Sequence, residues 1–457
     1  MDPFSRQVLD KLPLAESTLQ VFAYILDEPF LEDLFLRHRG ASYTKRITFP
    51  LMTELICEAL MSGKSGLRTF TAAHEKDVLE ASVEAAYKKL GRLPITLSTA
   101  LINECSPRVQ ALFPDVKGEA PLPKSLAGLV AIVVDGKVTK GIPHRLKPLR
   151  GKGGGLIGGK GLVAYHLESG LVVGLEADED GDANDIRLLP GLLPKVRATQ
   201  PGRRLWIADR QFSFASTLID FSEQNDAYLV RYSRAMPYER DPEVPSRTGT
   251  DADNRRYEEE WGWLGKWKSK SRCRVRRITV DRGSQEAIVL VTNLMDSETY
   301  PASDLLETYR NRPNIELVFQ RITEVLSLRR LIGTSARATV FQLSLCLLLY
   351  NVLQLVRGYV SRNANRSVSE VSPKKLLEDL RDELAGCRTV LGSEKWNMIV
   401  RPSTAEELKL WLESRLKVWH PHWKKAKRRR HRPEKVRRGK RHDSVFRLMK
   451  NSKKTEG

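Results

Sequence analysis

The spacing of apolar and polar positions divides the chain into regions of different secondary structure. Residues 1–125 carry apolar side chains at three- and four-residue intervals, which predicts helices. From residue 126 the pattern changes to short apolar runs rich in β-branched residues, which alternate with helical segments. Helical spacing resumes near residue 303 and continues to about residue 417. We therefore predict a helical N-terminal region, a central α/β region, a helical C-terminal region and a basic tail, at 1–125, 126–335, 336–422 and 423–457.

The central region has the predicted order strand, strand, strand, helix, strand, helix, strand. The first strand is LVAIVVD (129–135), a turn at Ser169–Gly170 joins the second and third, and the fourth is RRLWIAD (203–209). This order predicts an α/β domain. Residues 233–300 break the alternation, because they carry charged, Trp-rich sequence and a β-like EAIVLVTNL. We interpret them as a β-rich insertion.

Two of the predicted helical segments have more than one interpretation. Two helices joined at Gly91–Pro94 are compatible with a helix-turn-helix DNA reader, but spacing alone favours a plain helical hairpin. Residues 340–356 form the most apolar run of the chain. Polar residues such as Gln342 and Asn351 interrupt it, and it is shorter than the ~20 apolar residues of a membrane span. A buried core helix is the favoured interpretation.

Charge and cysteine content narrow the class of protein. The chain has 76 Lys and Arg residues against 56 Asp and Glu, a net charge of +20. This excess favours a polyanionic partner, with nucleic acid ahead of an anionic membrane. Residues 1–30 lack the basic-then-apolar pattern of a signal peptide. The five cysteines are scattered and form no CxxC motif, which argues against a disulfide framework or a zinc site and for a reducing cytoplasm.

Two acids stand at the carboxyl ends of predicted strands. Asp135 ends AIVVD and Asp209 ends LWIAD. Side chains at such ends project into the crevice where open α/β sheets place their sites. A single acid there usually caps a turn or a helix, but a pair at equivalent ends is harder to explain in that way. Two metal ions need several carboxylates that converge from different elements, so the pair is a candidate metal site.

A third acid lies near the start of a predicted helix in the segment YRNRPNIELVFQRITEVLSL. Pro313 suits the first turn of a helix, which places Glu316 close behind it. Ile315, Phe319 and Ile322 form an apolar stripe, and Glu316 belongs to the polar stripe beside it. A carboxylate in that position can face a cleft while the helix stays packed. Helical geometry alone favours an ordinary solvated glutamate.

The residues around these acids resemble those of bacterial insertion-sequence transposases of the DDE class, in the branch with a Tyr-Arg-Glu-Lys signature. Tyr309, Arg312 and Glu316 match the first three signature residues in type and spacing. The segments VLVTNLMD, ADRQF and GDANDIRLLPGLL are also similar to that family. The resemblance covers about residues 125–360. It implies a ribonuclease-H-like α/β fold, with a mixed sheet and a β-rich insertion between the second and third acids.

The chain departs from the signature at two positions. Thr323 stands where the signature has Lys, and Pro313 stands where a Trp often follows the Arg. If the signature Lys contacts a phosphate, that role moves here to Arg321 or Arg329, or is lost. In some relatives an aromatic residue of the insertion stacks on a flipped base, and Trp261, Trp263 and Trp267 are candidates for that role.

The resemblance implies a DNA transposase that cuts transposon ends and joins them to target DNA by a cut-and-paste route. Asp135 would bridge two divalent ions, Asp209 would hold one of them and Glu316 would complete the other shell; Mg²⁺ is expected, with Mn²⁺ as the alternative. The implied partner is double-stranded DNA, as terminal inverted repeats and as target, bound by a homodimer; a membrane is not expected as a partner. The expected location is the bacterial cytoplasm, at the nucleoid. The helical region 1–125 is a candidate for binding transposon ends.

Several basic residues are candidate DNA contacts. Arg312 and Tyr309 precede Glu316, and Arg210 follows Asp209, so each can reach a phosphate near the acids. Structural ion pairs are the alternative. The tail is a block of like charge in which burial of unpaired cations is too costly, and it predicts a disordered arm along DNA phosphates rather than a solubility tail. The candidate DNA contacts at its start are Lys424, Lys425, Arg428, Arg429 and Arg430.

Three other functions remain open from the sequence. A decayed or domesticated transposase would bind DNA without chemistry, and Thr323 is the best support for it. A ribonuclease-H-like nuclease would cut without joining. A ribosomal or RNA-associated protein is suggested by the basic tail alone. The three acids count against the first of these, and the family signature is what separates a transposase from the second.

Overall fold

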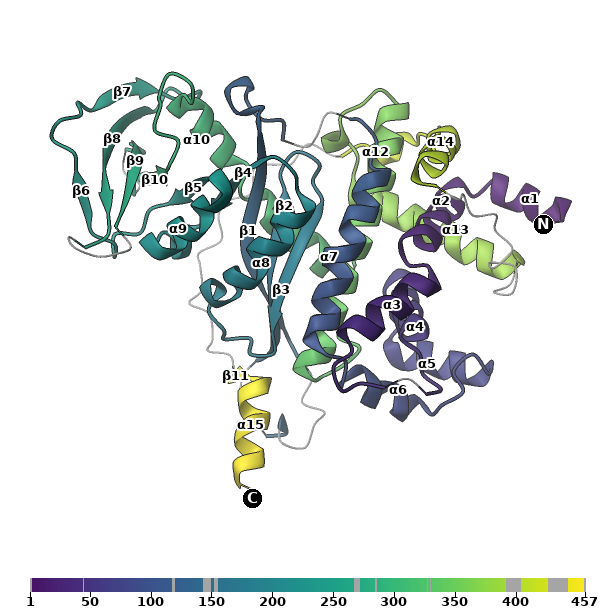
Figure 1. Cartoon of the computed structure of the whole chain (residues 1–457). Helices are drawn as coiled ribbons and strands as arrows, with labels where there is room; N and C mark the ends of the chain where they lie inside the picture. The colour runs from purple at the N-terminus through teal and green to yellow at the C-terminus, as the bar shows by residue number, and fades with distance from the viewer. Residues whose placement is uncertain are drawn as a thin grey trace.

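The computed structural model describes residues 2–43, 45–116, 120–142, 149–151, 155–266, 272–283, 286–326, 328, 330–391, 404–425 and 443–455. A mixed sheet runs through the middle of the molecule, with helices from both ends of the chain gathered on one side and the β-rich insertion on the other (Figure 1). The α/β fold with a β-rich insertion and helical flanks is therefore confirmed.

The five core strands have the ribonuclease-H-like order β3-β2-β1-β4-β5. β1 pairs antiparallel with β2 and parallel with β4, and β4 pairs parallel with β5. α8 follows β3 and α9 follows β4, as the sequence predicts. The elements are β1 (Leu129–Lys140), β2 (Leu156–His166), β3 (Val172–Asp178), α8 (Asp185–Thr199), β4 (Arg203–Ala208), α9 (Ala215–Ser222) and β5 (Ala227–Arg231).

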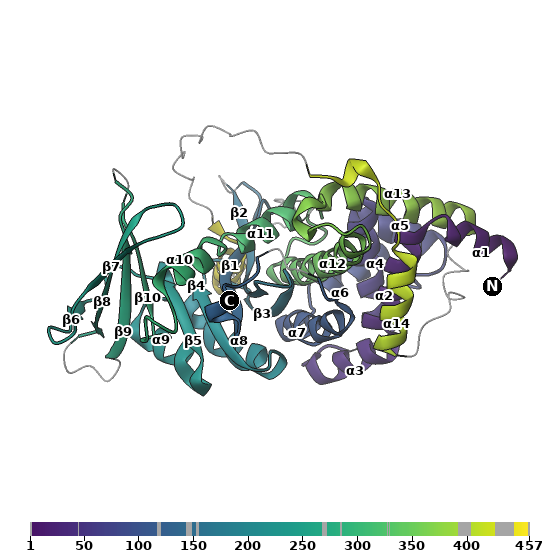
Figure 2. The ribbon, with the colours of Figure 1, turned by 90° about the horizontal axis from the view of Figure 1, so that it is seen from above.

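Helices from distant parts of the chain cover the sheet beside β3. The N-terminal elements are α1 (Pro3–Asp10), α2 (Pro13–Ile25), α3 (Glu28–His38), α4 (Phe49–Ser62), α5 (Gly66–Glu75), α6 (Val83–Leu90) and α7 (Ile95–Leu112). They pack with α12 (Ala336–Asn363), α13 (Pro373–Leu391) and α14 (Ala405–Arg415) (Figure 2).

Two buried asparagines fasten the core helices to strand β3. Asn103 of α7 donates to the carbonyl of Leu175 at 3.0 Å and accepts from its N–H at 2.9 Å. Asn351 of α12 makes the same pair of bonds with Val172, at 2.7 and 2.8 Å. Backbone groups on an unpaired strand edge need partners when they are buried. The two side chains meet that need and hold α7 and α12 in register with the sheet.

The structure decides both helical segments that the sequence left open. α6 and α7 form a hairpin, and α7 is largely buried between β3 and α12, so it cannot enter a DNA groove. Among the described residues, α12 is the one helix long and apolar enough to cross a membrane, and its most apolar stretch is entirely buried inside the protein. The prediction of a core helix is confirmed.

The insertion extends the central sheet instead of forming a separate one. β10 (Ile288–Thr292) pairs antiparallel with β5 and with β9 (Cys273–Val280), and β9 pairs with β8 (Arg256–Leu264). β6 (Tyr238–Arg240) and β7 (Arg247–Thr250) pair with β8. The chain then returns to the core through α10 (Ala302–Arg310) and α11 (Asn314–Glu324). The third acid can therefore lie beside the first two despite the long interval in sequence.

The end of the chain carries structure that the sequence did not predict. Residues 426–442, most of the predicted basic arm, lie outside the described residues. Beyond them, β11 (Asp443–Ser444) pairs parallel with β2, and α15 (Val445–Thr455) follows it. Asp180 accepts hydrogen bonds from Ser444 and Arg447, both at 2.9 Å. Residues 443–455 are thus docked on the sheet and do not form part of a disordered tail.

Candidate active site

Strands β1 and β4 bring the first two acids together. The parallel pairing of the two strands ends at Val133 and Ile207, and Asp135 and Asp209 each follow two residues later. The sequence predicted that the strand ends at Asp135, and this is wrong, because the strand extends beyond it. β1 continues to Lys140, because it remains paired with β2 after β4 has ended. Asp135 therefore lies inside a strand but at the carboxyl edge of the parallel pair.

The third acid reaches the same edge from α11. Pro313 precedes the helix as its N-cap, and Glu316 lies in the first turn, as predicted. The helix packs through Ile315, Val318 and Ile322, which are fully buried. Glu316 remains 58% exposed, whereas the side chains of Asp135 and Asp209 are 17% and 33% exposed. The site thus opens to solvent on the side of Glu316.

Arg312 joins the three acids through one guanidinium. Its Nη2 lies 3.1 Å from Asp135 Oδ2 and 4.0 Å from Asp209 Oδ2, and its Nη1 lies 2.8 Å from Glu316 Oε1. The side chains of Arg312 and Asp135 are 11% and 17% exposed, so the ion pair between them is shielded from water. Residues that are far apart in the sequence therefore converge on a single cation. We call Asp135, Asp209, Glu316 and Arg312 the carboxylate cluster.

Burial and charge act in opposite directions on this cluster. Burial raises the pKa of Asp135 to about 6, although the Arg312 guanidinium and the Gly136 N–H act to lower it. The charges of Glu316 and Asp185 add to the rise. Burial acts to lower the pKa of Arg312, but the carboxylates of Asp135 and Asp209 outweigh it and raise that pKa. Arg312 therefore stays charged and is the group that keeps Asp135 ionised at neutral pH.

The other residues that the sequence grouped with the acids make different hydrogen bonds. The hydroxyl of Tyr309 donates to the carbonyl of Ala208 at 3.3 Å, which fastens α10 to the end of β4. Arg321 lies 3.4 Å from the hydroxyl of Tyr350, a residue of the core helix α12. Thr323 donates to the carbonyl of its own helix at Phe319. The sequence grouped these residues with the acids, and the structure brings only Arg312 into contact with all three.

A small basic cavity lies next to Asp209. Its volume is about 180 Å³, and it is lined by Arg210, Arg231, Tyr232, Ser233, Arg234, Ala235, Glu286, Ala287 and Val289. Glu286 is the one acid among these residues, at 4.0 Å from Arg231 and 3.7 Å from Arg234. Arg210 was predicted, but Arg231 and Arg234 were missed. Arg231 is the last residue of β5, the strand next to β4. A basic residue at the end of a third strand was therefore the feature of the sequence that could have identified it.

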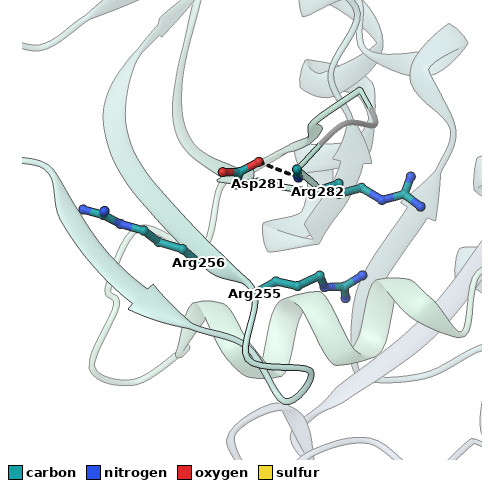
Figure 3. A pocket seen from close by; sticks show the side chains of 5 residues that line it. Arg255, Arg256, Asp281 and Arg282 are labelled. Carbon is teal, nitrogen blue, oxygen red and sulfur yellow. Dashed lines mark hydrogen bonds between the residues drawn. The ribbon is translucent and has the colours of Figure 1, made fainter.

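A second cavity lies in the insertion, between the start of β8 and the end of β9 (Figure 3). Its volume is about 380 Å³, and its lining is Arg255, Arg256, Asp281, Arg282 and Gly283. Arg255 already pairs with Asp251 at 2.8 Å. The cavity shares no lining residue with the carboxylate cluster.

The insertion tryptophans differ in their accessibility. Trp261 is buried and its indole N–H donates to the carbonyl of Met295, so it cannot stack on a base. Trp263 lies beneath Arg272 and Arg274, whose guanidinium carbons are 4.9 and 5.9 Å from the ring centre. Trp267 lies outside the described residues.

The residues of the tail are only partly described. Lys424 and Lys425 are exposed, and their backbones are held by Val371 and Glu370. Arg428, Arg429 and Arg430 lie outside the described residues.

The donor chemistry of the cluster suits a divalent ion, but its present arrangement does not. Asp135, Asp209 and Glu316 offer hard carboxylate oxygens, which Mg²⁺ and Mn²⁺ prefer. Over the described residues, no three acid, histidine or cysteine side chains lie close enough together to hold an ion. Arg312 occupies the space between the three carboxylates. Ion binding by all three therefore requires this guanidinium to move.

The central part of the chain, with its mixed sheet and its cluster of acids, is similar to a known domain family. Residues 127–352, which include all three acids, match the family model of the transposase DDE domain. No curated protein matches the sequence. Among solved structures, the piggyBac transposase in a synaptic complex with hairpin DNA is similar, at 12% sequence identity and a TM-score of 0.41. The similarity covers 90% of this chain and 86% of that chain.

Proposed function

We propose that the protein is a transposase that cuts the ends of a DNA element and joins them to target DNA. The observation that supports this most directly is the convergence of Asp135, Asp209 and Glu316 on Arg312 inside a transposase DDE domain. Phosphodiester cleavage and strand transfer both attack phosphorus with an oxygen nucleophile, and neither needs a covalent protein intermediate. Three carboxylates at one strand edge are suited to that chemistry.

Divalent ions, with Mg²⁺ expected and Mn²⁺ as the alternative, belong to this proposal. Asp135, Asp209 and Glu316 would hold two of them, and bound ions supply activation of the attacking oxygen and stabilisation of the leaving oxygen. The role of the chain itself is positional. β1 and β4 fix the two aspartates, while α11 presents the exposed Glu316.

Arg312 has a second role in this proposal. In the structure its guanidinium neutralises the acids, and a DNA phosphate offers the same bidentate acceptor geometry as a carboxylate. We propose that a phosphate next to the cleavage site takes this guanidinium. The transfer frees the three carboxylates when DNA is present. Arg210 and Arg231, in the cavity beside Asp209, would hold the neighbouring backbone phosphates.

The proposed partner is double-stranded DNA, first as terminal inverted repeats and then as target. The net charge of +20 supports a polyanionic partner. We further propose that a homodimer pairs two element ends, that a bacterial cytoplasm is the site of action, and that region 1–125 contributes to end binding. These proposals rest on the family resemblance and on charge, and α7 is not the recognition element because it is buried.

The direct test replaces Asp135, Asp209 and Glu316 singly by alanine. Each variant should lose Mg²⁺-dependent cleavage of DNA ends taken from the sequence that flanks the gene, yet retain DNA binding and its melting temperature. Glu307→Ala is the matched control, since this exposed glutamate lies on the preceding helix and should cut normally. Cleavage by any one of the three variants at the control rate would remove that residue from the site.

A strand-transfer assay separates the two enzymatic alternatives. A transposase joins the cut 3′ end to a target duplex, whereas a nuclease releases the end without joining it. A protein that binds the ends but neither cuts nor joins in Mg²⁺ or Mn²⁺ would support the decayed transposase.

A further inference from the structure

A fourth carboxylate, Asp185, lies next to the cluster and takes no part in the proposed chemistry. It is the first residue of α8, and it is 5% exposed. Its Oδ1 lies 2.7 Å from Lys160 Nζ on β2, and its Oδ2 accepts a hydrogen bond from Gln211 Nε2 at 2.6 Å. A buried ion pair is weak evidence for stability, because desolvation of two charges offsets much of their attraction. Its location therefore suggests another purpose.

The contacts of Asp185 lead to both aspartates of the cluster. Gln211 belongs to the 3₁₀ turn Arg210–Phe212, for which Asp209 is the N-cap. On the other side, a Cβ added to Gly136 would lie 2.3 Å from Asp185 Oδ1 and 2.6 Å from Oδ2. The carboxylate is thus seated against the backbone of the residue that follows Asp135. Only glycine at position 136 leaves room for it.

We propose that Asp185, held by Lys160, is a positioning residue that sets the spacing between Asp135 and Asp209. The proposal rests on the proposed function of those two acids. Asp185 contacts the segment behind each of them, while Lys160 also donates to the carbonyl of Ala183 and so keeps the start of α8 on β2. The carboxylate charge of Asp185 also acts on Asp135, whose pKa it raises.

The size of the expected effect follows from geometry. Without the Asp185 carboxylate, the Gln211 side chain loses its acceptor and Gly136 loses the group packed against it, so we expect the two aspartates to shift by a fraction of an ångström to about an ångström. A misplacement of about 1 Å can cost roughly 10²-fold in rate. We expect Asp185→Asn to lower kcat for end cleavage by about 10- to 100-fold at saturating DNA, with little change in DNA affinity.

Loss of fold stability would also lower activity, so the test separates the two effects. Asp185→Asn leaves the buried Lys160 without its acid, and Lys160→Met leaves Asp185 without its cation. The double variant removes both charges and should recover the melting temperature, because an unpaired buried charge costs more than a neutral pair. We expect cleavage to stay low in the double variant even though stability returns.

Asn184→Ala is the matched control for the helix start. Asn184 caps α8 by accepting from the Ile186 N–H at 3.1 Å, but it is exposed and its side chain bonds only the start of its own helix among the described residues. Its loss should lower the melting temperature slightly and leave kcat unchanged. Mn²⁺ affinity, measured by calorimetry without DNA, gives a readout that does not depend on activity. It should fall in the double variant and not in the control.

The outcomes are distinct for the two proposals. Wild-type kcat and Mn²⁺ affinity in the double variant, with Asp135→Ala inactive, would overturn the role of Asp185 alone. An equal loss in Asn184→Ala would also overturn it, since the effect would then come from the helix end. Full activity of Asp135→Ala would instead overturn the proposed function.

Discussion

The arrangement of the carboxylate cluster predicts that removal of Arg312 strengthens divalent ion binding while it abolishes cleavage. In the structure the guanidinium holds Asp135 at 3.1 Å and Glu316 at 2.8 Å, and an ion must displace it to reach all three acids. Arg312→Ala removes that competition. It also removes the cation that we propose for the DNA phosphate, so tighter ion binding should not restore activity.

The magnitude depends mainly on the Asp135 pair. Glu316 is more than half exposed, so its bond to Arg312 contributes little. The Asp135 bond is shielded, and a charge-assisted hydrogen bond of this kind contributes about 1.5–3 kcal/mol. At about 1.4 kcal/mol per factor of ten, the variant should bind Mn²⁺ roughly 10- to 100-fold more tightly than the wild type.

The assay is calorimetric titration of Mn²⁺ at pH 8 without DNA. This pH lies above the pKa of about 6 at Asp135, so that its carboxylate is charged in the wild type. Loss of Arg312 raises the pKa of Asp135 further, so more of this carboxyl is protonated as pH falls toward 6. The increase in Mn²⁺ affinity should therefore become smaller at lower pH. Arg310→Ala is the matched control, because Arg310 pairs with Asp251 at 2.8 Å and touches none of the acids.

The reasoning would be refuted by Mn²⁺ affinity that is equal or weaker in Arg312→Ala than in the control at pH 8. That result would mean that the guanidinium helps to assemble the ion site instead of occupying it. Retained end cleavage by the variant would separately remove Arg312 from phosphate binding.

Three further predictions test other parts of the molecule. Burial raises the pKa of Glu383 to about 7, although the N–H groups of Ala15 and Leu14 act to lower it. Folding stability should therefore fall as pH rises from about 4.5 to 7, because the unfolded chain loses this proton first. Glu383→Gln should flatten the fall of melting temperature with pH, and an unchanged dependence on pH would contradict the prediction. Asp226 is buried and accepts a hydrogen bond from Arg197 at 3.1 Å. Asp226→Ala should lower the free energy of unfolding in urea by about 3–5 kcal/mol, and a decrease below about 1 kcal/mol would count against this prediction. Neutral substitutions in residues 426–442, with 443–457 kept, should weaken binding to all DNA equally and lower the salt slope by ~0.9 per lost phosphate contact; an unaltered slope would exclude a DNA arm.

Local patterns were reliable where one face of an element is buried. The spacing of Ile315 and Ile322 predicted the packed face of α11, and Pro313 predicted its start. The interrupted apolar run at 340–356 predicted a core helix, which α12 is. Such periodicity follows from burial of one side of a helix or strand, so a single sequence suffices to detect it.

The ends of elements and their distant partners were less accessible. The strand β1 runs beyond Asp135 because β2 continues to pair with it, and nothing within 129–135 reports that pairing. The short strand β11 and helix α15 follow a long basic block, and their packing depends on an edge of β2 that is remote in sequence. Both outcomes depend on hydrogen bonds between segments that local propensity does not encode.

By itself, the sequence determined the order of strands and helices in the central region, the basic character of the protein and the three acids on which its proposed chemistry rests. Only the tertiary structure decided that Arg312 lies among those acids, that Tyr309 faces Ala208, and that Arg231 and Asp185 belong to their surroundings. The reason is physical. Periodicity along a chain records which face of an element is buried, but the partner that a buried charge finds depends on strand register and on the approach of helices from elsewhere in the chain.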